Sequence, residues 1–212
     1  MIYLSRLTTR AFEPSTRAKT IPVDEAPAGL QRAVFDDPIE EGIVGLTARL
    51  DELPVRRPAL ELGLRWMAQH RPPPPERSTI VHGDVRNGNI IVDDDGLAAI
   101  LDWEIASVGG DPMHDLAWTA ARMWRGRQDA VEIGGLAQRD ALIRGYAGAG
   151  GTFDEARFEW WKVSRAVWWA LGLAHQAESF LDGSVPSIVM AASGRRVSEL
   201  EWDLLMLTRP DA

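Results

Sequence analysis

The segment from residue 79 to residue 101 constrains the fold more than any other part of the chain. It holds three short apolar runs, at residues 79–81, 89–92 and 97–101. The second and third runs are joined by three aspartates and Gly96, and an Asp-Gly pair between two apolar runs is typical of a β-hairpin. The sequence therefore predicts one short strand followed by a hairpin.

Outside this segment, apolar residues recur mainly at intervals of three and four, which is the spacing of an amphipathic helix. This pattern predicts helices over residues 39–53, 112–124, 137–147, 154–181 and 184–207, and another from Pro58 to the proline run at 72–75. Pro58 and Pro112 suit the first turn of a helix, because a missing N–H breaks no hydrogen bond there. The fold class that we expect is α+β, mainly helical, with a small β-hairpin.

The charge balance narrows the possible partners. Among 212 residues, 31 are acidic and 23 are Lys or Arg, so the formal net charge is -8, which argues against a nucleic acid or an anionic membrane as partner. The absence of cysteine excludes a disulfide scaffold, a thiolate zinc site and a cysteine nucleophile. No apolar run reaches the roughly 18 residues of a membrane span, and the N-terminus lacks the pattern of a secretion signal. We therefore expect a cytoplasmic protein.

The first 57 residues are the least regular part of the chain. Residues 1–36 follow neither a helical nor a strand period, which predicts a mostly irregular arm. We accordingly divide the chain into residues 1–57, an arm with one helix, and residues 58–212, which carry the other predicted elements.

Three oxygen-bearing side chains occur where the predicted strands end. Asp84 follows the first strand, Asn89 opens the hairpin and Asp102 follows its second strand. Because the two ends of a hairpin are neighbours, Asn89 and Asp102 should face a common volume with Asp84 beside it. An amide oxygen and a carboxylate suit Mg²⁺, which takes phosphate oxygens as further ligands. A second carboxylate beside that ion can accept the proton of an attacking hydroxyl, as in phosphoryl transfer.

The same residues form a recognisable motif. The pattern His82-Gly83-Asp84, four residues, Asn89, a hairpin and then Asp102 resembles that of the aminoglycoside phosphotransferase and choline kinase superfamily, which has the protein-kinase-like fold. Residues 110–118, with the sequence Gly-Asp-Pro-Met-His-Asp-Leu-Ala-Trp, resemble the second signature of that superfamily.

A narrower resemblance concerns residues 101–104, 122–125 and 194–203, which are similar to the kinase domain of acyl-CoA dehydrogenase family members 10 and 11. The whole resemblance covers about residues 58–207. It implies that the chain has the C-terminal lobe of the protein-kinase-like fold, and that it phosphorylates a hydroxyl of a small molecule. A hydroxyacyl compound is then a more plausible substrate than an aminoglycoside.

The resemblance assigns the central roles to three residues. Asp84 is the expected catalytic base, which deprotonates the substrate hydroxyl. Asn89 and Asp102 are the expected ligands of Mg²⁺, and they bind the phosphates of ATP or GTP through that ion.

Three further residues receive supporting roles from the resemblance. His82 is expected to organise the catalytic loop, although a histidine at this position could also act as a general base. Asp115 is expected to support the loop from the following helix. Glu104 is either a weak second contact to metal or a carboxylate that fixes the loop.

Two features depart from the superfamily pattern. Members have an N-terminal lobe with a nucleotide-covering loop and a phosphate-binding lysine, whereas the two lysines here are Lys19, outside any predicted strand, and Lys162, inside a predicted helix. The usual nucleotide-binding lobe is therefore not expected in residues 1–57. The second departure is an additional glycine within residues 108–111, which could shift the loop after Asp102.

These departures leave alternatives open. The chain could be half of an enzyme that needs an N-terminal lobe from another chain, or it could form a homo-oligomer. It could also be a non-catalytic or truncated remnant, or a metal-dependent hydrolase that uses the same carboxylates.

Aromatic and basic residues allow two interpretations. Four of the nine tryptophans lie on the helix predicted over residues 154–181, where core packing is expected and an aromatic wall for a substrate is the alternative. Three arginines within residues 122–127 are expected on a solvated helix face, or else beside an anionic substrate.

Overall fold

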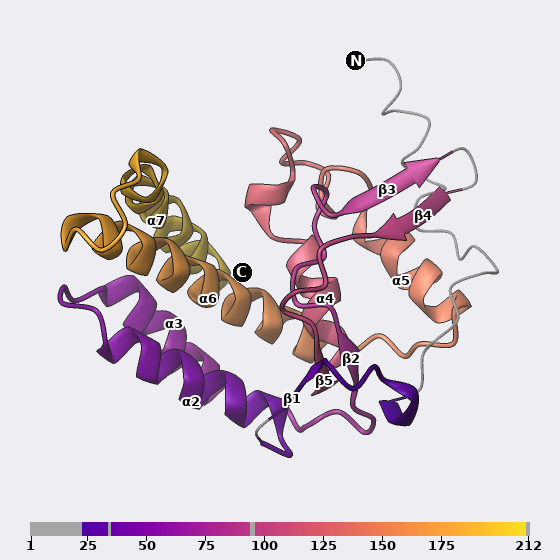
Figure 1. The fold of residues 1–212 in the computed structure, drawn as a ribbon. Helices are drawn as coiled ribbons and strands as arrows, with labels where there is room; N and C mark the ends of the chain where they lie inside the picture. Colours follow the sequence, from indigo (N-terminus) through magenta and orange to yellow (C-terminus); the bar gives the residue numbers. More distant parts are fainter. Residues whose placement is uncertain (1–22, 34, 94–95, 211–212) are drawn as a thin grey trace. The chain divides into compact units, whose positions relative to one another are not determined.

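The computed structural model describes residues 23–33, 35–93 and 96–210 of the chain (Figure 1). In chain order its elements are η1 (Val23–Glu25), β1 (Gln31–Arg32), α2 (Pro38–Asp51), α3 (Pro58–Gln69), β2 (Thr79–Val81), β3 (Ile90–Asp93), β4 (Gly96–Ile100), β5 (Ser107–Gly110), α4 (Pro112–Thr119), η2 (Arg122–Trp124), α5 (Arg139–Gly148), α6 (Glu155–Leu181) and α7 (Ile188–Leu207). The predicted α+β class with a majority of helix is confirmed.

The described residues form two compact units. The first contains the chain up to Asp36 together with Pro74–Trp161, so it holds every described strand and all the motif residues. The second contains Asp37–Pro73 and the chain from Lys162 onward, and its described elements are helices. The division predicted between residues 57 and 58 separates an irregular arm from the segment with the motif. It stays a prediction, because the two compact units do not show which segment binds a nucleotide.

The first unit contains a three-stranded sheet in the order β1-β5-β2. β5 pairs parallel with β1 and antiparallel with β2, where Ile80 lies opposite Val108. Val81 and Val108 are buried, and α4 packs against β2. The sequence analysis predicted β2 but missed β5, because Ser-Val-Gly-Gly lacks the apolar alternation of a strand.

Two glycines allow β5 to approach its neighbours. Gly109 has a φ of +103°, which residues with a side chain adopt only under strain. A Cβ at this position would also lie 3.1 Å from the Cβ of Ala33. A Cβ on Gly110 would lie 2.6 Å from Cγ1 of Val81. The additional glycine of residues 108–111 therefore lies in a strand, where it permits close pairing.

The predicted hairpin is confirmed. β3 pairs antiparallel with β4, and Ile90 lies opposite Ile100. The register shifts between Ile91 and Val92, as in a β-bulge, which bends the strand locally. Residues 94 and 95 of the connecting turn lie outside the described part of the chain.

Helix α4 begins as predicted but ends earlier. The Asp111 carboxylate caps it by accepting the N–H of Met113 at 2.9 Å, and Pro112 occupies the first turn. The predicted helix to residue 124 is wrong, because Ala121 is extended and the Thr119 carbonyl accepts an N–H from Gly134 at 2.8 Å. The chain continues as the 3₁₀ turn η2.

The first turns of α6 complete the core of the first unit. Trp160 is fully buried and Trp161 is 6% exposed, which confirms core packing for these two tryptophans. The Trp161 indole donates to Asp111 at 2.9 Å, so the start of α6 is bonded to the cap of α4.

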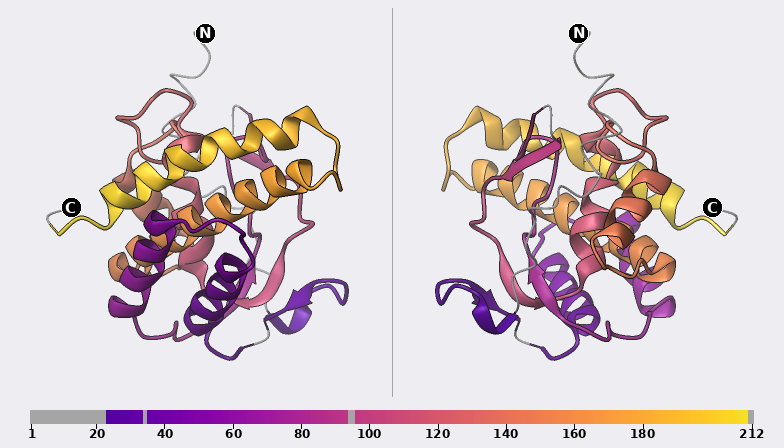
Figure 2. Two further views of the ribbon diagram at one scale, coloured as in Figure 1. Left: turned by 90° about the vertical axis from the view of Figure 1, so that its left-hand side faces the viewer. Right: turned by 90° about the vertical axis from the view of Figure 1, so that its right-hand side faces the viewer.

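The second unit is built from α2, α3, α7 and the part of α6 that begins at Lys162. A Cβ on Gly63 of α3 would lie 3.0 Å from Val167 of α6 and 3.3 Å from Leu204 of α7, so α3 packs closely on α6 and α7. Both views in Figure 2 show α7, in yellow, running beside the C-terminal part of α6. Buried apolar residues of this unit include Leu60, Met67, Leu171, Val197, Leu200 and Leu204.

The described helices include none that combines the length and the apolar character needed to span a membrane.

We predict that Gly110→Ala destabilises the first unit. The new methyl group would overlap the Val81 side chain, and overpacking of this kind costs about 1–3 kcal/mol. Gly45→Ala is the matched control, because a Cβ on this α2 glycine has no neighbour within 4 Å and alanine favours helix. Urea unfolding followed by circular dichroism should show a lower midpoint for the first variant only, and equal midpoints would contradict the packing argument.

Candidate active site

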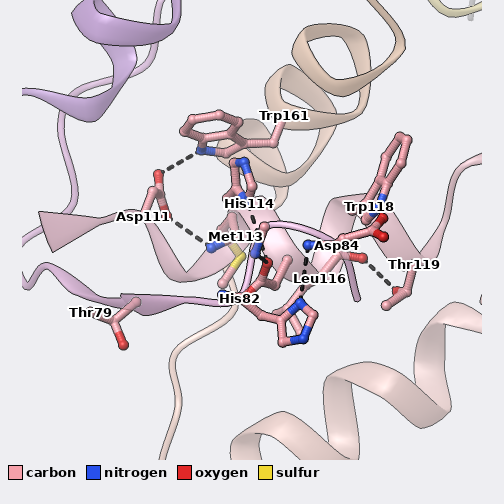
Figure 3. Close-up of polar contacts among 12 residues, drawn as sticks. Thr79, His82, Asp84, Asp111, Met113, His114, Leu116, Trp118, Thr119 and Trp161 are labelled. Atoms are coloured by element: carbon pink, nitrogen blue, oxygen red, sulfur yellow. Dashed lines mark hydrogen bonds and ion pairs between the residues drawn. The ribbon is translucent and has the colours of Figure 1, made fainter. Parts of the chain in front are cut away.

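The candidate site is built on the loop between β2 and β3, which holds residues 82–89 (Figure 3). The loop turns away from the end of β2 at Gly83, whose φ is +86°. A Cβ on Gly83 would also lie 3.0 Å from the Ile105 side chain. Only glycine fits this turn without strain, so the path of the backbone requires the glycine of the His-Gly-Asp sequence.

The Asp84 carboxylate accepts three hydrogen bonds from side chains. Oδ1 accepts from the Trp118 indole at 2.7 Å, and Oδ2 accepts from Arg86 Nε at 3.0 Å and from Asn89 Nδ2 at 2.8 Å. The side chain is half-buried. These donors come from both the loop and α4, so the carboxylate has a fixed orientation before any substrate binds.

Arg86 is itself positioned by an aromatic side chain. Its guanidinium lies 5.1 Å from the ring centroid of Trp124, and Trp124 packs edge-on against Trp118. The Trp124 carbonyl also accepts a hydrogen bond from Asn87 at 2.6 Å. The turn η2 is thereby attached to the loop that holds residues 82–89.

Both ring nitrogens of His82 are engaged by the backbone. Nδ1 faces the N–H of Asp84 at 3.1 Å and can only accept from it, so Nε2 carries the proton and donates to the carbonyl of Leu101 at 2.8 Å. The ring edge also contacts Trp103, with centroids 4.6 Å apart. The imidazole thereby links the loop to the segment after β4.

Asp115 lies in the first turn of α4 and accepts two backbone hydrogen bonds from the loop. Its Oδ2 accepts from the N–H of His82 at 2.7 Å, and its Oδ1 accepts from the N–H of Gly83 at 2.8 Å. Burial alone would raise the pKa of this carboxyl, but hydrogen bonds from His114, His82 and Gly83 outweigh burial and hold the pKa below its usual value. The carboxylate thus bonds the first turn of α4 to the loop.

Asn89 and Asp102 lie at the open end of the hairpin. The N–H of Leu101 donates to the Asn89 carbonyl at 2.7 Å, which brings the residue before Asp102 against Asn89. The Asn89 amide N–H₂ donates to the carbonyl and to the carboxylate of Asp84, so its Oδ1 is the atom that can accept or coordinate a further group.

Asp102 and Glu104 are exposed. Asp102 has a φ of +67°, which is uncommon outside glycine, and such backbone strain is frequent at functional sites. Within the described ranges, neither carboxylate has a hydrogen bond or an ion pair. The described residues also contain no cluster of three His, Asp or Glu side chains that could hold a metal by itself.

The sequence analysis missed Arg86, Trp118 and Trp124. Trp118 was accessible to sequence reasoning, because it lies three residues after Asp115 and therefore on the same face of a helix. Arg86 lies two residues after Asp84, within reach of its carboxylate. The role of Trp124 depends on the early end of α4, which the helical period did not indicate.

Other sequence expectations fall outside this cluster. Lys19 lies outside the described residues, and Lys162 lies on α6 in the second unit. Arg125 donates to the carbonyls of Asp129 and Ala120, both at 3.0 Å, so it fixes the loop that follows α4.

Comparison with known proteins agrees with this geometry. A profile of the phosphotransferase enzyme family matches residues 21–161, which is more than half of the chain. The chain belongs to this family. The match includes all the motif residues of the candidate site.

Acyl-CoA dehydrogenase family member 10 of Mus musculus is 39% identical over 64 residues, which are 29% of this chain and 6% of the mouse protein. A Ralstonia eutropha protein assigned provisionally as an aminoglycoside phosphotransferase superposes with a TM-score of 0.62 and 18% identity, over 97% of this chain and 64% of that one. Macrolide 2'-phosphotransferase MphH of Brachybacterium faecium superposes with a TM-score of 0.57 and 17% identity, over 92% of this chain and 61% of that one. The chain therefore spans a small part of the mouse relative and less than two thirds of these structures, which show its kinase-like fold.

We predict that the Trp118 indole senses the charge of Asp84. In ¹H–¹⁵N spectra the Trp118 indole peak, assigned by its loss in Trp118→Phe, should move in Asp84→Asn, because a charged acceptor becomes neutral. The matched control is the Trp103 indole, which donates to the carbonyl of Ile100 at 2.8 Å. A Trp118 peak that stays as unchanged as that of Trp103 would contradict the contact.

We also predict that Asp115→Asn lowers stability by about 1–3 kcal/mol near neutral pH, because an amide cannot accept both loop N–H groups equally well. The native pKa lies below the unfolded value, so the carboxylate stabilises the fold above about pH 4 and this contribution is lost as pH falls through the native pKa. Urea unfolding of both proteins should therefore show a difference that shrinks in acid. Glu76→Gln, at an exposed loop carboxylate, is the control. A difference independent of pH would argue against the ionised contact.

Proposed function

We propose that this chain transfers the terminal phosphoryl group of ATP or GTP to a hydroxyl of a small molecule. The observation that carries this proposal is the fixed Asp84 carboxylate. It is bonded to the amide of Asn89, whose backbone in turn holds the segment that leads to Asp102. A rigid acceptor beside two oxygen ligands is what phosphoryl transfer requires, since catalysis there depends mainly on positioning and charge.

Asp84 is the base of the proposed reaction. The substrate oxygen forms a bond to the terminal phosphorus, and the bond from that phosphorus to the bridging oxygen of the nucleotide breaks. The hydroxyl proton passes to the Asp84 carboxylate. Trp118 and Arg86 keep both carboxylate oxygens in place, so that the remaining lone pairs face the substrate.

Asn89 and Asp102 would hold Mg²⁺. Their donor set fits this ion, because Asn89 has an uncommitted amide oxygen and Asp102 presents an exposed carboxylate. Two protein ligands suffice, since Mg²⁺ usually keeps waters and phosphate oxygens as its other ligands. Held by these residues, the ion would supply positive charge beside the phosphates. Glu104, two residues after Asp102, is a weaker candidate for contact through water.

His82 and Asp115 act on the reaction through the loop. His82 joins the loop to the backbone of Leu101, and Asp115 fixes the N–H groups that precede Asp84. Neither side chain needs to contact the substrate for this role. The similarity to an acyl-CoA dehydrogenase family member supports a hydroxyacyl compound as the substrate class.

A second candidate function is a half-enzyme whose nucleotide is enclosed by a lobe of another chain. Four apolar side chains near the site favour this alternative, because they are exposed in the first unit: Ile91 (47%), Leu101 (47%), Trp103 (46%) and Ile105 (39%). Apolar side chains that are grouped on a surface are typical of a site that a ligand or another protein covers.

We predict that isothermal titration calorimetry detects ATP binding that requires Mg²⁺ and is abolished in Asp102→Ala. Asp84→Asn should retain that binding but lose phosphoryl transfer to a panel of small alcohols and hydroxyacyl compounds by about 10²–10⁴-fold, the usual contribution of a general base. Glu76→Ala is the control for a lost surface carboxylate.

Each result separates the alternatives. Equal binding by the wild type and Asp102→Ala would refute the metal assignment, and full turnover in Asp84→Asn would refute the assignment of the base. A folded chain that binds no nucleotide alone would favour the half-enzyme.

A further inference from the structure

Helix α7 has an outward stripe of side chains that the fold does not use. Its inward residues Ser193, Val197, Leu200 and Leu204 are buried. On the other side, six residues at intervals of four, three, four, three and four are all exposed: Ile188, Ala192, Arg195, Glu199, Trp202 and Met206. The alternation of four and three makes equivalent positions recur every seven residues, which is the repeat that keeps a single line of side chains facing a partner helix in a coiled coil.

The composition of the stripe is symmetric about its centre. Large apolar side chains lie near its ends, where Ile188 is 78% exposed and Trp202 is 58% exposed. The oppositely charged Arg195 and Glu199 lie in the middle. A solvated helix face would not require two apolar ends of this size.

We propose that α7 pairs antiparallel with α7 of a second copy of this chain. A two-fold axis near the level of Val197 then places Ile188 opposite Met206, Ala192 opposite Trp202, and Arg195 opposite Glu199. Each pair occurs twice, as in any isologous interface.

The three pairs are complementary in different ways. Ile188 and Met206 bury apolar surface against each other. The small Ala192 leaves room for the indole of Trp202. Arg195 and Glu199 form an ion pair across the interface, and two such pairs flank the axis.

Charge and size select this orientation over the parallel one. In a parallel pair in register, Arg195 would face Arg195, Glu199 would face Glu199 and Trp202 would face Trp202. Like charges in contact oppose association, so the sequence of the stripe disfavours that arrangement.

The length of the helix indicates the strength of the dimer. α7 has 20 residues and is therefore about 30 Å long. A single pair of helices of this length buries an area at or below the roughly 1,200 Å² at the low end of stable interfaces, so we expect micromolar association.

Charge reversal tests the pairing. Arg195→Glu and Glu199→Arg should each be monomeric by sedimentation or light scattering, with a mass near 23.4 kDa, at concentrations where the wild type has twice that mass. An equimolar mixture of the two variants should recover the dimer, because a helix with acidic side chains at both positions then faces a helix with basic side chains at both. The double variant should also dimerise, since it exchanges the two charges and keeps each pair opposite in sign.

The mixture separates loss of pairing from loss of folding, since an unfolded variant could not be rescued by another. Arg144→Glu, at an exposed ion pair with Asp140 on α5, is the matched control and should leave the dimer unchanged. A monomeric wild type at several hundred micromolar would overturn the proposal, as would a dimer that neither reversal weakens. A mixture that stays monomeric would overturn the antiparallel register.

Discussion

The candidate site depends on one carboxylate that accepts two backbone N–H groups. At the end of β2 the chain turns through Gly83, and the N–H groups of His82 and Gly83 follow the last residue of the strand. Asp115 supplies one oxygen to each of them from the first turn of α4. Asp111 caps the same helix and accepts a hydrogen bond from Trp161 of α6. The core of the first unit therefore fixes the position of α4, and α4 fixes the position of the loop. A buried polar cluster of this kind is stabilising only when it is fully satisfied, which constrains every residue in it.

The amide at position 89 is the second constraint. An aspartate there would face the Asp84 carboxylate as a like charge, whereas the amide N–H₂ donates to it and still leaves an oxygen for a cation. The alternation of Asp84, Asn89 and Asp102 would therefore let the proposed base and the proposed metal site lie side by side without direct repulsion. Arg86 and Trp118 complete this arrangement, because each donates to Asp84 and together with Asn89 they leave one lone-pair site of the carboxylate open.

Local sequence rules predicted the parts of the fold that depend on neighbours in the chain. The hairpin, the cap at Asp111 and the long helix α6 follow from turn chemistry and periodicity, and the hairpin brought Asn89 near Asp102. Strand β5 was missed because its pairing depends on a partner distant in the sequence. The Val81 side chain packs so close to Gly110 that a side chain at position 110 would not fit. The end of α4 was missed for a similar reason, since the Thr119 carbonyl is bonded to Gly134 of a later loop. Arg86 and Trp118 are near the motif in the sequence, but only their contacts with Asp84 show what they do.

The two units differ in which side chains they expose. The proposed reaction and the proposed dimer therefore involve different units. In the first unit the polar side chains of the loop bond to one another and to α4, and the exposed apolar residues include Leu101, Trp103 and Ile105, which follow β4. In the second unit the helices bury their apolar faces on one another, and α7 carries a second line of side chains, which are exposed and have heptad spacing. Substitutions along that line leave every hydrogen bond of the Asp84 cluster in place, because all of its donors belong to the first unit. A dimer formed through α7 would therefore alter the local concentration of sites without changing their chemistry, and any effect of dimerisation on turnover would have to arise from a contact outside the cluster.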